Sequence, residues 1–492
     1  MKKTLVKLLS VLCVAAVVAT SFAACSSAPS SSASGETESS TNTGKLPTIT
    51  WWLCGSAPAN LADGLKEINA YIADKVGVQL DIQVAGWDAY AQKMNTIINS
   101  GDYFDIMFVN NTNYNRFVNQ EKFLDITDMV QTETPELFKL IPETVWQGTY
   151  VGGKSYAVPT YKDSSVTQYF VWDDAYVQKY NIDYANIKTL QQLDAPLRAI
   201  KEGEGNGFYP LQLIKGDGFN GLLNNYDDLT LGIPPIGVSV TDEANRKVVS
   251  VLEQPDVMEN LTLLHQWFSD GIINQDAPTL SEAPKGRPFF SAQAFPGAEA
   301  SYQVNEGVDK YVMTQISDSL YTTSSIQGSL NAISAASKYQ KESLKFLELV
   351  NTDSKLRNML AYGIEGTDWE ATGEENVIER ISDTWSLSAY QQGTFFNLAA
   401  VAPNKGDQYD AVKVLNEAAK PSACLGFALD ISKLSTEVSN CNTIWEKYKY
   451  DLLTGASDPA ETVPQIVAEM KANGMDTIMA EAQKQIDAYF AE

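Results

Sequence analysis

Residues 48–110 alternate short apolar segments with longer amphipathic ones. The segments "TITWWLCG" (48–55), "VQLDIQVAG" (78–86) and "FDIMFVN" (104–110) have the length and composition of β-strands. Amphipathic segments at 59–77 and 87–101 separate them and predict helices. Strands joined by helices of this length form βαβ units, so we predict an α/β fold built on a parallel sheet.

Several polar and aromatic residues lie at or just after the ends of these predicted strands. In parallel sheets, ligands bind beyond the carboxyl ends of the strands. Alternation along the first strand sends Trp51 toward the core and its neighbour to the other face. The residues that share this edge, and that we predict to contact a solute, are Trp52, Trp87, Asn110, Asn111 and Tyr114.

The rest of the chain also mixes strands and helices. The segment "VGGKSYAVPTYKD" (151–163) predicts a Gly-Gly turn followed by extended chain that leaves the first sheet. Residues 329–369 predict one strand and two helices, and the C-terminal region predicts helices interrupted at Asn473-Gly474. A chain of 492 residues exceeds what one core supports, so two lobes are expected.

Composition excludes several classes of function. The formal net charge of −25 repels nucleic acid, whose phosphates need clustered Lys and Arg. The single His265 lies on a predicted amphipathic helix and is expected to pack there, so neither a Ser/His/Asp triad nor a His-rich zinc site can be built easily. The acidic run "KGDGFNGLLNNYDD" (215–228) lacks the alternation that calcium ligation requires. We therefore predict no metal, no cofactor and no nucleic-acid partner.

Beyond the N-terminal segment, the chain contains Cys54, Cys424 and Cys441, without a CxxC spacing. An odd number leaves at least one free thiol, and Cys424 with Cys441 is the only pair worth considering. Three buried thiols are the simpler expectation.

The N-terminus has the layout of an export signal. Three lysines precede an apolar stretch at 8–18, and "FAAC" ends it at Cys25, where bacterial lipoproteins carry the lipidated cysteine. A plain secretory signal is the alternative. We predict a signal peptide over 1–24, followed over 25–46 by the lipidated Cys25 and a flexible Ser/Thr-rich tether at the outer face of the cell membrane.

Taken together, these features resemble the family 1 extracellular solute-binding proteins of ABC importers. The segments that carry the likeness include "SGDYFDIMFV" (100–109), "GKSYAVPT" (153–160) and "AASKYQKESLKFLELVNTD" (335–353). Farther along, "LAYGIEGTDW" (360–369) and "AEAQKQIDAYF" (480–490) are similar to the LplA-like branch, which has a DUF3502-type C-terminal region.

The resemblance implies a two-lobed periplasmic-binding-protein clamshell of type II, with hinge crossings near 158–162, 314–319 and just beyond Trp369. Lobe 1 would hold residues 47–158 and 319–375. Lobe 2 would hold residues 159–318 and 376–492, including the C-terminal helices. Such a protein is expected to act as a monomer beside ABC permease subunits.

The resemblance also suggests solute contacts outside the first sheet. Aromatic faces cover the apolar side of sugar rings while polar side chains bind the hydroxyls, and this chain has 9 Trp and 23 Tyr. The residues that fall in such segments are Tyr161, Lys162, Asp163, Glu299, Glu365 and Trp369.

We therefore predict a lipid-anchored receptor that captures an oligosaccharide, hands it to a permease and performs no chemistry. The alternatives are a receptor for a peptide or an amino-acid-derived solute, a surface glycoside hydrolase with two facing carboxylates, and a scaffold without a ligand.

Overall fold

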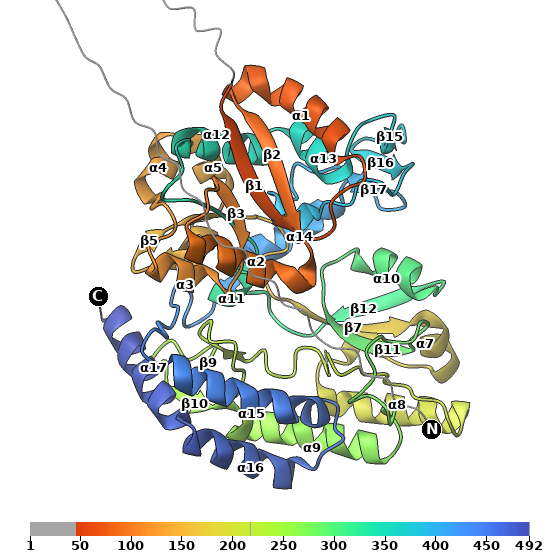
Figure 1. The fold of residues 1–492 in the computed structure, drawn as a ribbon. Helices are drawn as coiled ribbons and strands as arrows, with labels where there is room; N and C mark the ends of the chain where they lie inside the picture. Colours follow the sequence, from red (N-terminus) through yellow and green to blue (C-terminus); the bar gives the residue numbers. More distant parts are fainter. Residues whose placement is uncertain (1–45, 217, 492) are drawn as a thin grey trace, which may run out of the picture. The chain divides into compact units, whose positions relative to one another are not determined.

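The computed structural model describes residues 46–216 and 218–491 (Figure 1). Its buried apolar side chains form two large separate clusters, one containing Trp51 and the other containing Trp172. The predicted two-lobed α/β fold is therefore confirmed. The predicted signal and Cys25 lie outside the described residues, as does the tether except for Leu46.

A five-stranded sheet organises lobe 1. Its strand order is β2-β1-β3-β14-β6, and the predicted parallel pairing holds for the first three strands. The later strand β14 runs antiparallel to both of its neighbours. Trp51 lies opposite Ile82 and Ile106 and is fully buried, as the alternation predicts. The strands are β1 (Thr48–Cys54), β2 (Gln79–Ala85), β3 (Ile106–Val109), β6 (Ala157–Pro159) and β14 (Leu330–Ile333).

Helices pack around this sheet, with α1 beside β2 (Figure 1). The first two helices end at Gly77 and Gly101, whose left-handed backbone lets each N–H cap the last turn. The helices of lobe 1 are α1 (Leu61–Val76), α2 (Trp87–Ser100), α3 (Tyr114–Asn119), α4 (Thr127–Thr132), α5 (Pro135–Leu140), α6 (Glu143–Gln147), α11 (Thr323–Ile326), α12 (Gln340–Thr352) and α13 (Ser354–Tyr362). A small hairpin joins β4 (Tyr150–Val151) to β5 (Lys154–Ser155) across the predicted Gly-Gly turn.

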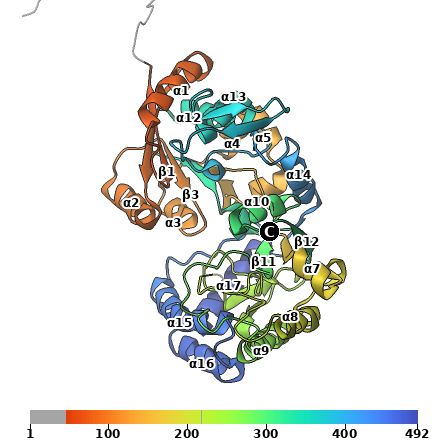
Figure 2. The ribbon, with the colours of Figure 1, turned by 90° about the vertical axis from the view of Figure 1, so that its right-hand side faces the viewer.

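Lobe 2 combines small antiparallel sheets with a layer of helices. Three helices of the C-terminal region, α15, α16 and α17, pack together, and α15 and α16 also pack against α9 (Figures 1 and 2). The predicted interruption at Asn473-Gly474 separates α16 from α17. The sheets are β11-β7-β12 and β10-β9-β8, with strands β7 (Gln168–Asp173), β8 (Tyr226–Asp227), β9 (Ile236–Ser239), β10 (Val248–Ser250), β11 (Phe289–Gln293) and β12 (Tyr311–Gln315). The helices are α7 (Asp174–Tyr180), α8 (Leu190–Glu204), α9 (Pro255–Ser269), α10 (Ala298–Glu306), α15 (Ser435–Leu453), α16 (Pro459–Ala472) and α17 (Met475–Tyr489).

The expected lobe boundary beyond residue 375 differs from the packing. Trp385 and Leu387 belong to the first core, and the Trp385 indole N–H donates to the Leu360 carbonyl. Gly64 on α1 makes room for this ring, since a Cβ there would lie 2.2 Å from it. After residue 375 the chain next contributes to the second core at Cys424, so this packing does not support a crossing just beyond Trp369.

The remaining strands, helix α14 and the last 3-10 turn lie on this return path or close to the crossings, and the first two 3-10 turns belong to lobe 2. They are β13 (Leu320–Tyr321), β15 (Trp369–Ala371), β16 (Val377–Arg380), β17 (Ala400–Val401), α14 (Gln408–Ala418), β18 (Lys420–Pro421) and three single 3-10 turns at Tyr184–Asn186, Val251–Glu253 and Ala389–Gln391.

The side chains test the predictions for the cysteines and for His265. Cys54, Cys424 and Cys441 are buried free thiols, so the expectation of three buried thiols is confirmed. His265 packs on α9, where its ring nitrogen Nδ1 lies 2.8 Å from the Gly455 carbonyl oxygen. Within residues 46–216 and 218–491, no helix has the length and apolar character needed to cross a membrane.

Candidate functional site

The chain between β6 and β7 forms a crossing that several side chains hold in place. Asn416 of α14 donates to the Lys162 carbonyl at 2.5 Å and accepts from the Ser165 N–H at 3.2 Å. Thr394 donates to the Tyr161 carbonyl at 2.8 Å. Lys162 Nζ lies 2.7 Å from Asp163 Oδ1, and both side chains of this pair are partly buried. The crossing therefore has a defined backbone on which polar side chains are displayed.

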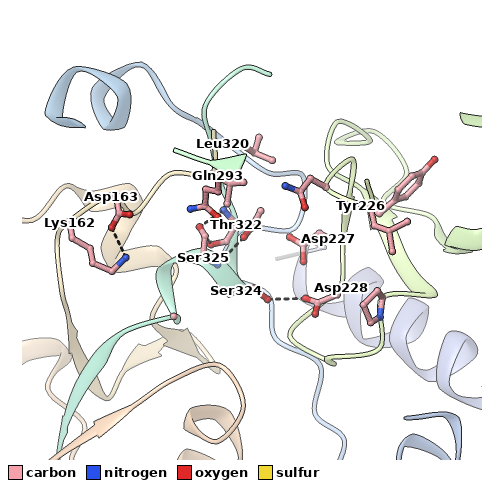
Figure 3. A pocket seen from close by; sticks show the side chains of 15 residues that line it. Lys162, Asp163, Tyr226, Asp227, Asp228, Gln293, Leu320, Thr322, Ser324 and Ser325 are labelled. Carbon is pink, nitrogen blue, oxygen red and sulfur yellow. Dashed lines mark hydrogen bonds and ion pairs between the residues drawn. The ribbon is translucent and has the colours of Figure 1, made fainter. Parts of the chain in front are cut away.

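A pocket of about 470 Å³ lies at this crossing (Figure 3). Its volume falls within the range typical of sites for small organic ligands. Carboxylates, amides and hydroxyls dominate its polar lining, which suits hydrogen bonding to a polyhydroxylated molecule. These polar residues are Lys162, Asp163, Asn224, Tyr226, Asp227, Asp228, Gln293, Thr322, Ser324 and Ser325.

The acidic wall of this pocket follows β8. Asp228 Oδ1 accepts hydrogen bonds from Ser324 Oγ at 2.8 Å and from the Thr230 N–H at 3.1 Å. Leu229 and Thr230 both have left-handed backbones, with φ of 58° and 60°. This conformation is unfavourable for a β-branched residue, so the contacts around Thr230 must hold it. Asn115 of α3 supplies one of them by donating to Thr230 Oγ1 at 3.1 Å.

Asp227 occupies the most enclosed position in this wall. Its carboxylate accepts from the Leu229 N–H at 2.9 Å and from Ser422 Oγ at 3.0 Å. Burial, reinforced by the neighbouring Asp228, raises the pKa of Asp227 to about 6. At neutral pH the carboxyl group is thus predominantly ionised despite its burial.

Two stacked aromatic rings form a platform on lobe 1. Trp87, the first residue of α2, is 56% exposed, and its ring lies 6.3 Å from that of Tyr390 at an interplanar angle of 12°. Phe108 supports Tyr390 edge-on at 6.0 Å. An exposed indole backed by a second ring offers a flat apolar face of the kind that sugar rings contact.

Hydrogen bonds hold the loop 388–394, which carries Tyr390, against strand β1 of lobe 1. Gln391 pairs with Cys54 through two hydrogen bonds, accepting from its N–H at 2.8 Å and donating to its carbonyl at 2.9 Å. The loop that carries Tyr390 is linked to the pocket through the backbone: Ser329 Oγ donates to the Tyr390 carbonyl at 2.8 Å, and its neighbour Gly328 lines the pocket.

A buried arginine organises the same loop. The fully buried Arg357 of α13 donates to the carbonyls of Thr394 at 2.9 Å and Ala389 at 2.8 Å, and to Gln392 Oε1 at 2.6 Å. Burial lowers the pKa of the Arg357 guanidinium to about 10, so the group stays charged at neutral pH. Its positive charge is therefore stabilised by loop carbonyl groups.

The predicted solute-binding residues divide between several locations. Lys162 and Asp163 line the pocket, and Trp87 forms the platform. Asn110 is partly buried and uses Oδ1 to accept from the Thr112 hydroxyl and N–H, while Asn111 next to it is also partly buried.

Two predicted contacts are wrong because their side chains are buried. Tyr114 is fully buried and donates to the Thr149 carbonyl at 2.6 Å. Tyr161 is 3% exposed, and its ring packs 4.6 Å from Phe396. Both side chains fill the first core, although their backbones lie near the expected edge.

Other predicted residues lie apart from the pocket. Glu365 and Trp369 line a separate pocket of about 700 Å³ between α1 and α13, and Trp369 donates to the Gly363 carbonyl at 3.2 Å. Glu299 accepts from the Gly297 N–H at the start of α10. Trp52 is partly buried, with Lys93 Nζ 5.3 Å above its ring. We favour the smaller pocket because it lies at the crossing and has the more polar walls.

Sequence reasoning missed much of this site. The run 215–228 lacks the spacing of a calcium loop and carries no predicted solute contact, yet it supplies Asn224, Asp227 and Asp228 to the pocket. Tyr390 stands immediately before "QQGTFF", and Arg357 looks like an ordinary helix-surface residue. The consecutive acids "DD" before "LTLG" were the available signal for a tight, carboxylate-lined turn.

Comparison with known proteins identifies the family. The model of the bacterial extracellular solute-binding proteins matches residues 58–355, and a domain of unknown function, DUF3502, matches residues 423–491. A carbohydrate ABC transporter substrate-binding protein of Streptococcus pneumoniae is 29% identical, over 92% of this chain and 93% of that protein.

Solved structures of solute-binding proteins have a similar fold. The N-glycan transport solute binding protein (NgtS) of S. pneumoniae superposes with a TM-score of 0.79 at 26% identity, covering 91% of this chain and 99% of that one. Its complex with Man5GlcNAc gives 0.70 at 26% identity, covering 90% and 98%. These relatives are substrate-binding proteins and not enzymes, which favours a receptor over a glycoside hydrolase. The chain belongs to the bacterial extracellular solute-binding protein family.

Proposed function

We propose that this protein is the receptor of a carbohydrate ABC importer and that it binds an oligosaccharide across the crossing pocket and the Trp87–Tyr390 platform. The observation that carries the proposal is a 470 Å³ pocket with many polar lining residues, in which the lining residue Gly328 precedes Ser329, the donor to the backbone carbonyl of Tyr390 in the platform loop. A pocket rich in donors and acceptors next to an apolar ring face matches the two kinds of surface on a sugar. The S. pneumoniae relatives named for carbohydrate and N-glycan transport support it.

The same proposal extends to the cell surface. Lipidated Cys25 would anchor the receptor to the outer face of the membrane, and the Ser/Thr-rich segment would let the monomeric folded part reach the permease. Extracellular location follows from the family, whereas the anchor rests on the "FAAC" sequence.

Isothermal titration calorimetry with a panel of oligosaccharides, including Man5GlcNAc, tests the function. We expect saturable heat with at least one glycan, and chromatography after long incubation should recover the sugar unchanged. At one hundred times its dissociation constant, such a ligand should add about 2.7 kcal/mol to the free energy of unfolding. Binding of peptides or amino acids alone, with no response to any glycan, would refute the proposal.

A further inference from the structure

The charged groups of the crossing pocket are mostly acidic. Asp163, Asp227 and Asp228 supply three carboxylates, while Lys162 is the one cationic side chain among the residues that line it. Lys162 is already paired with Asp163 at 2.7 Å. At neutral pH these four groups leave a formal charge of −2 on the pocket wall.

This charge is fixed in place by the surrounding structure. Ser324, Thr230 and Gly232 all donate to the Asp228 carboxylate, at 2.8, 3.1 and 3.2 Å. Figure 3 shows the Asp228–Ser324 contact on one side of the pocket and the Lys162–Asp163 pair on the other. The Asp228 carboxylate therefore cannot turn away from a bound solute without breaking several hydrogen bonds, and Asp163 is held by its ion pair with Lys162.

A neutral sugar and an acidic sugar should differ in their affinity for this acidic pocket wall. Hydroxyl groups can donate to free carboxylate lone pairs, and such charge-assisted hydrogen bonds are stronger than neutral ones. A sugar carboxylate has no proton to donate at neutral pH and faces like charges in a partly desolvated space, where electrostatic repulsion is strong. The protein's overall charge of −25 opposes its approach as well.

From these contacts we infer that the pocket selects uncharged oligosaccharides and rejects those that carry carboxylate groups, such as uronic or sialic acids. The inference rests on the proposed function and deepens it, because it names the class of sugar. Its physical basis is the excess of fixed carboxylates over the single, already paired lysine.

The test compares two probes that differ only in charge. One is the neutral glycan that binds best in calorimetry, and the other is the same glycan with one terminal primary alcohol oxidised to a carboxylate. We expect the acidic probe to bind at least tenfold more weakly at neutral pH. Absence of binding by every glycan, neutral or acidic, would contradict the proposed function, whereas equal or tighter binding of the acidic probe would overturn the inference alone.

Variants of the Lys162–Asp163 pair test whether the pocket causes the difference in affinity between the two probes. Asp163→Asn removes a carboxylate and releases the lysine, so the ratio of neutral to acidic affinity should fall at least threefold. Lys162→Met removes the positive charge and should raise the same ratio. Because a general loss of binding lowers both affinities together, the ratio reports charge selection alone. Asp63→Asn, in an exposed ion pair with Lys66, is the matched control and should leave the ratio unchanged. An unchanged ratio in both pocket variants would also overturn the inference.

Discussion

Arg357→Met is expected to destabilise the protein by about 3 kcal/mol or more, because it removes every donor that Arg357 supplies to the loop 388–394. The Thr394 carbonyl and Gln392 Oε1 would lose the buried guanidinium donor, and the Ala389 carbonyl would keep only the Gln392 N–H. Each buried polar group left without a partner costs about 1–3 kcal/mol. The free energy of unfolding from urea titration measures the effect.

The matched control is Arg116→Met, since Arg116 is exposed and donates to the side chain of Asn95. Substitutions at such surface positions usually change stability by less than about 0.5 kcal/mol. Arg357→Lys should recover only part of the loss, because an ammonium group cannot reproduce the planar fork. A loss below about 1 kcal/mol for Arg357→Met would show that the buried guanidinium does not organise this loop.

Trp87→Ala should weaken sugar binding by roughly thirtyfold, equivalent to about 2 kcal/mol, with little change in stability. The side chain is 56% exposed, so its removal leaves no cavity in the core. Loss of the indole removes the apolar face that we place against a sugar ring, while Tyr390 behind it remains. Calorimetry with the best glycan and urea unfolding of the same variant measure the two effects.

Two variants sharpen this experiment. Trp87→Phe keeps a flat ring and should retain most of the affinity. Val414→Ala alters another exposed apolar side chain, on α14, and should change neither quantity. Full affinity in Trp87→Ala would remove the platform from the proposed site.

Local patterns predicted the first sheet well. Alternation placed Trp51 in the core, and the strand and helix segments from 48 to 110 lie within a few residues of the observed elements. Such features depend on neighbours in sequence, so the chain itself contains the needed information. The antiparallel β14 could not be oriented in this way, because its partners β3 and β6 are distant in sequence.

The site was harder to predict because long-range contacts build it. Arg357 lies on a helix whose sequence does not indicate burial. It is buried by the loop 388–394, which is more than thirty residues later in the sequence. Tyr114 was misplaced for the converse reason, since its position after β3 is right but its ring turns inward beneath the Thr149 carbonyl. Lys162 and Asp163, which the sequence predicts as solute contacts, line the pocket because they lie on the crossing itself.

A crystal structure of the protein with its best-binding glycan tests the central claim most directly. The account predicts one sugar ring stacked on Trp87 and hydroxyl groups of the same glycan within hydrogen-bonding distance of Asp163 or Asp228. A glycan bound in the 700 Å³ pocket beside Trp369, with Trp87 and the crossing pocket both uncovered, would contradict it.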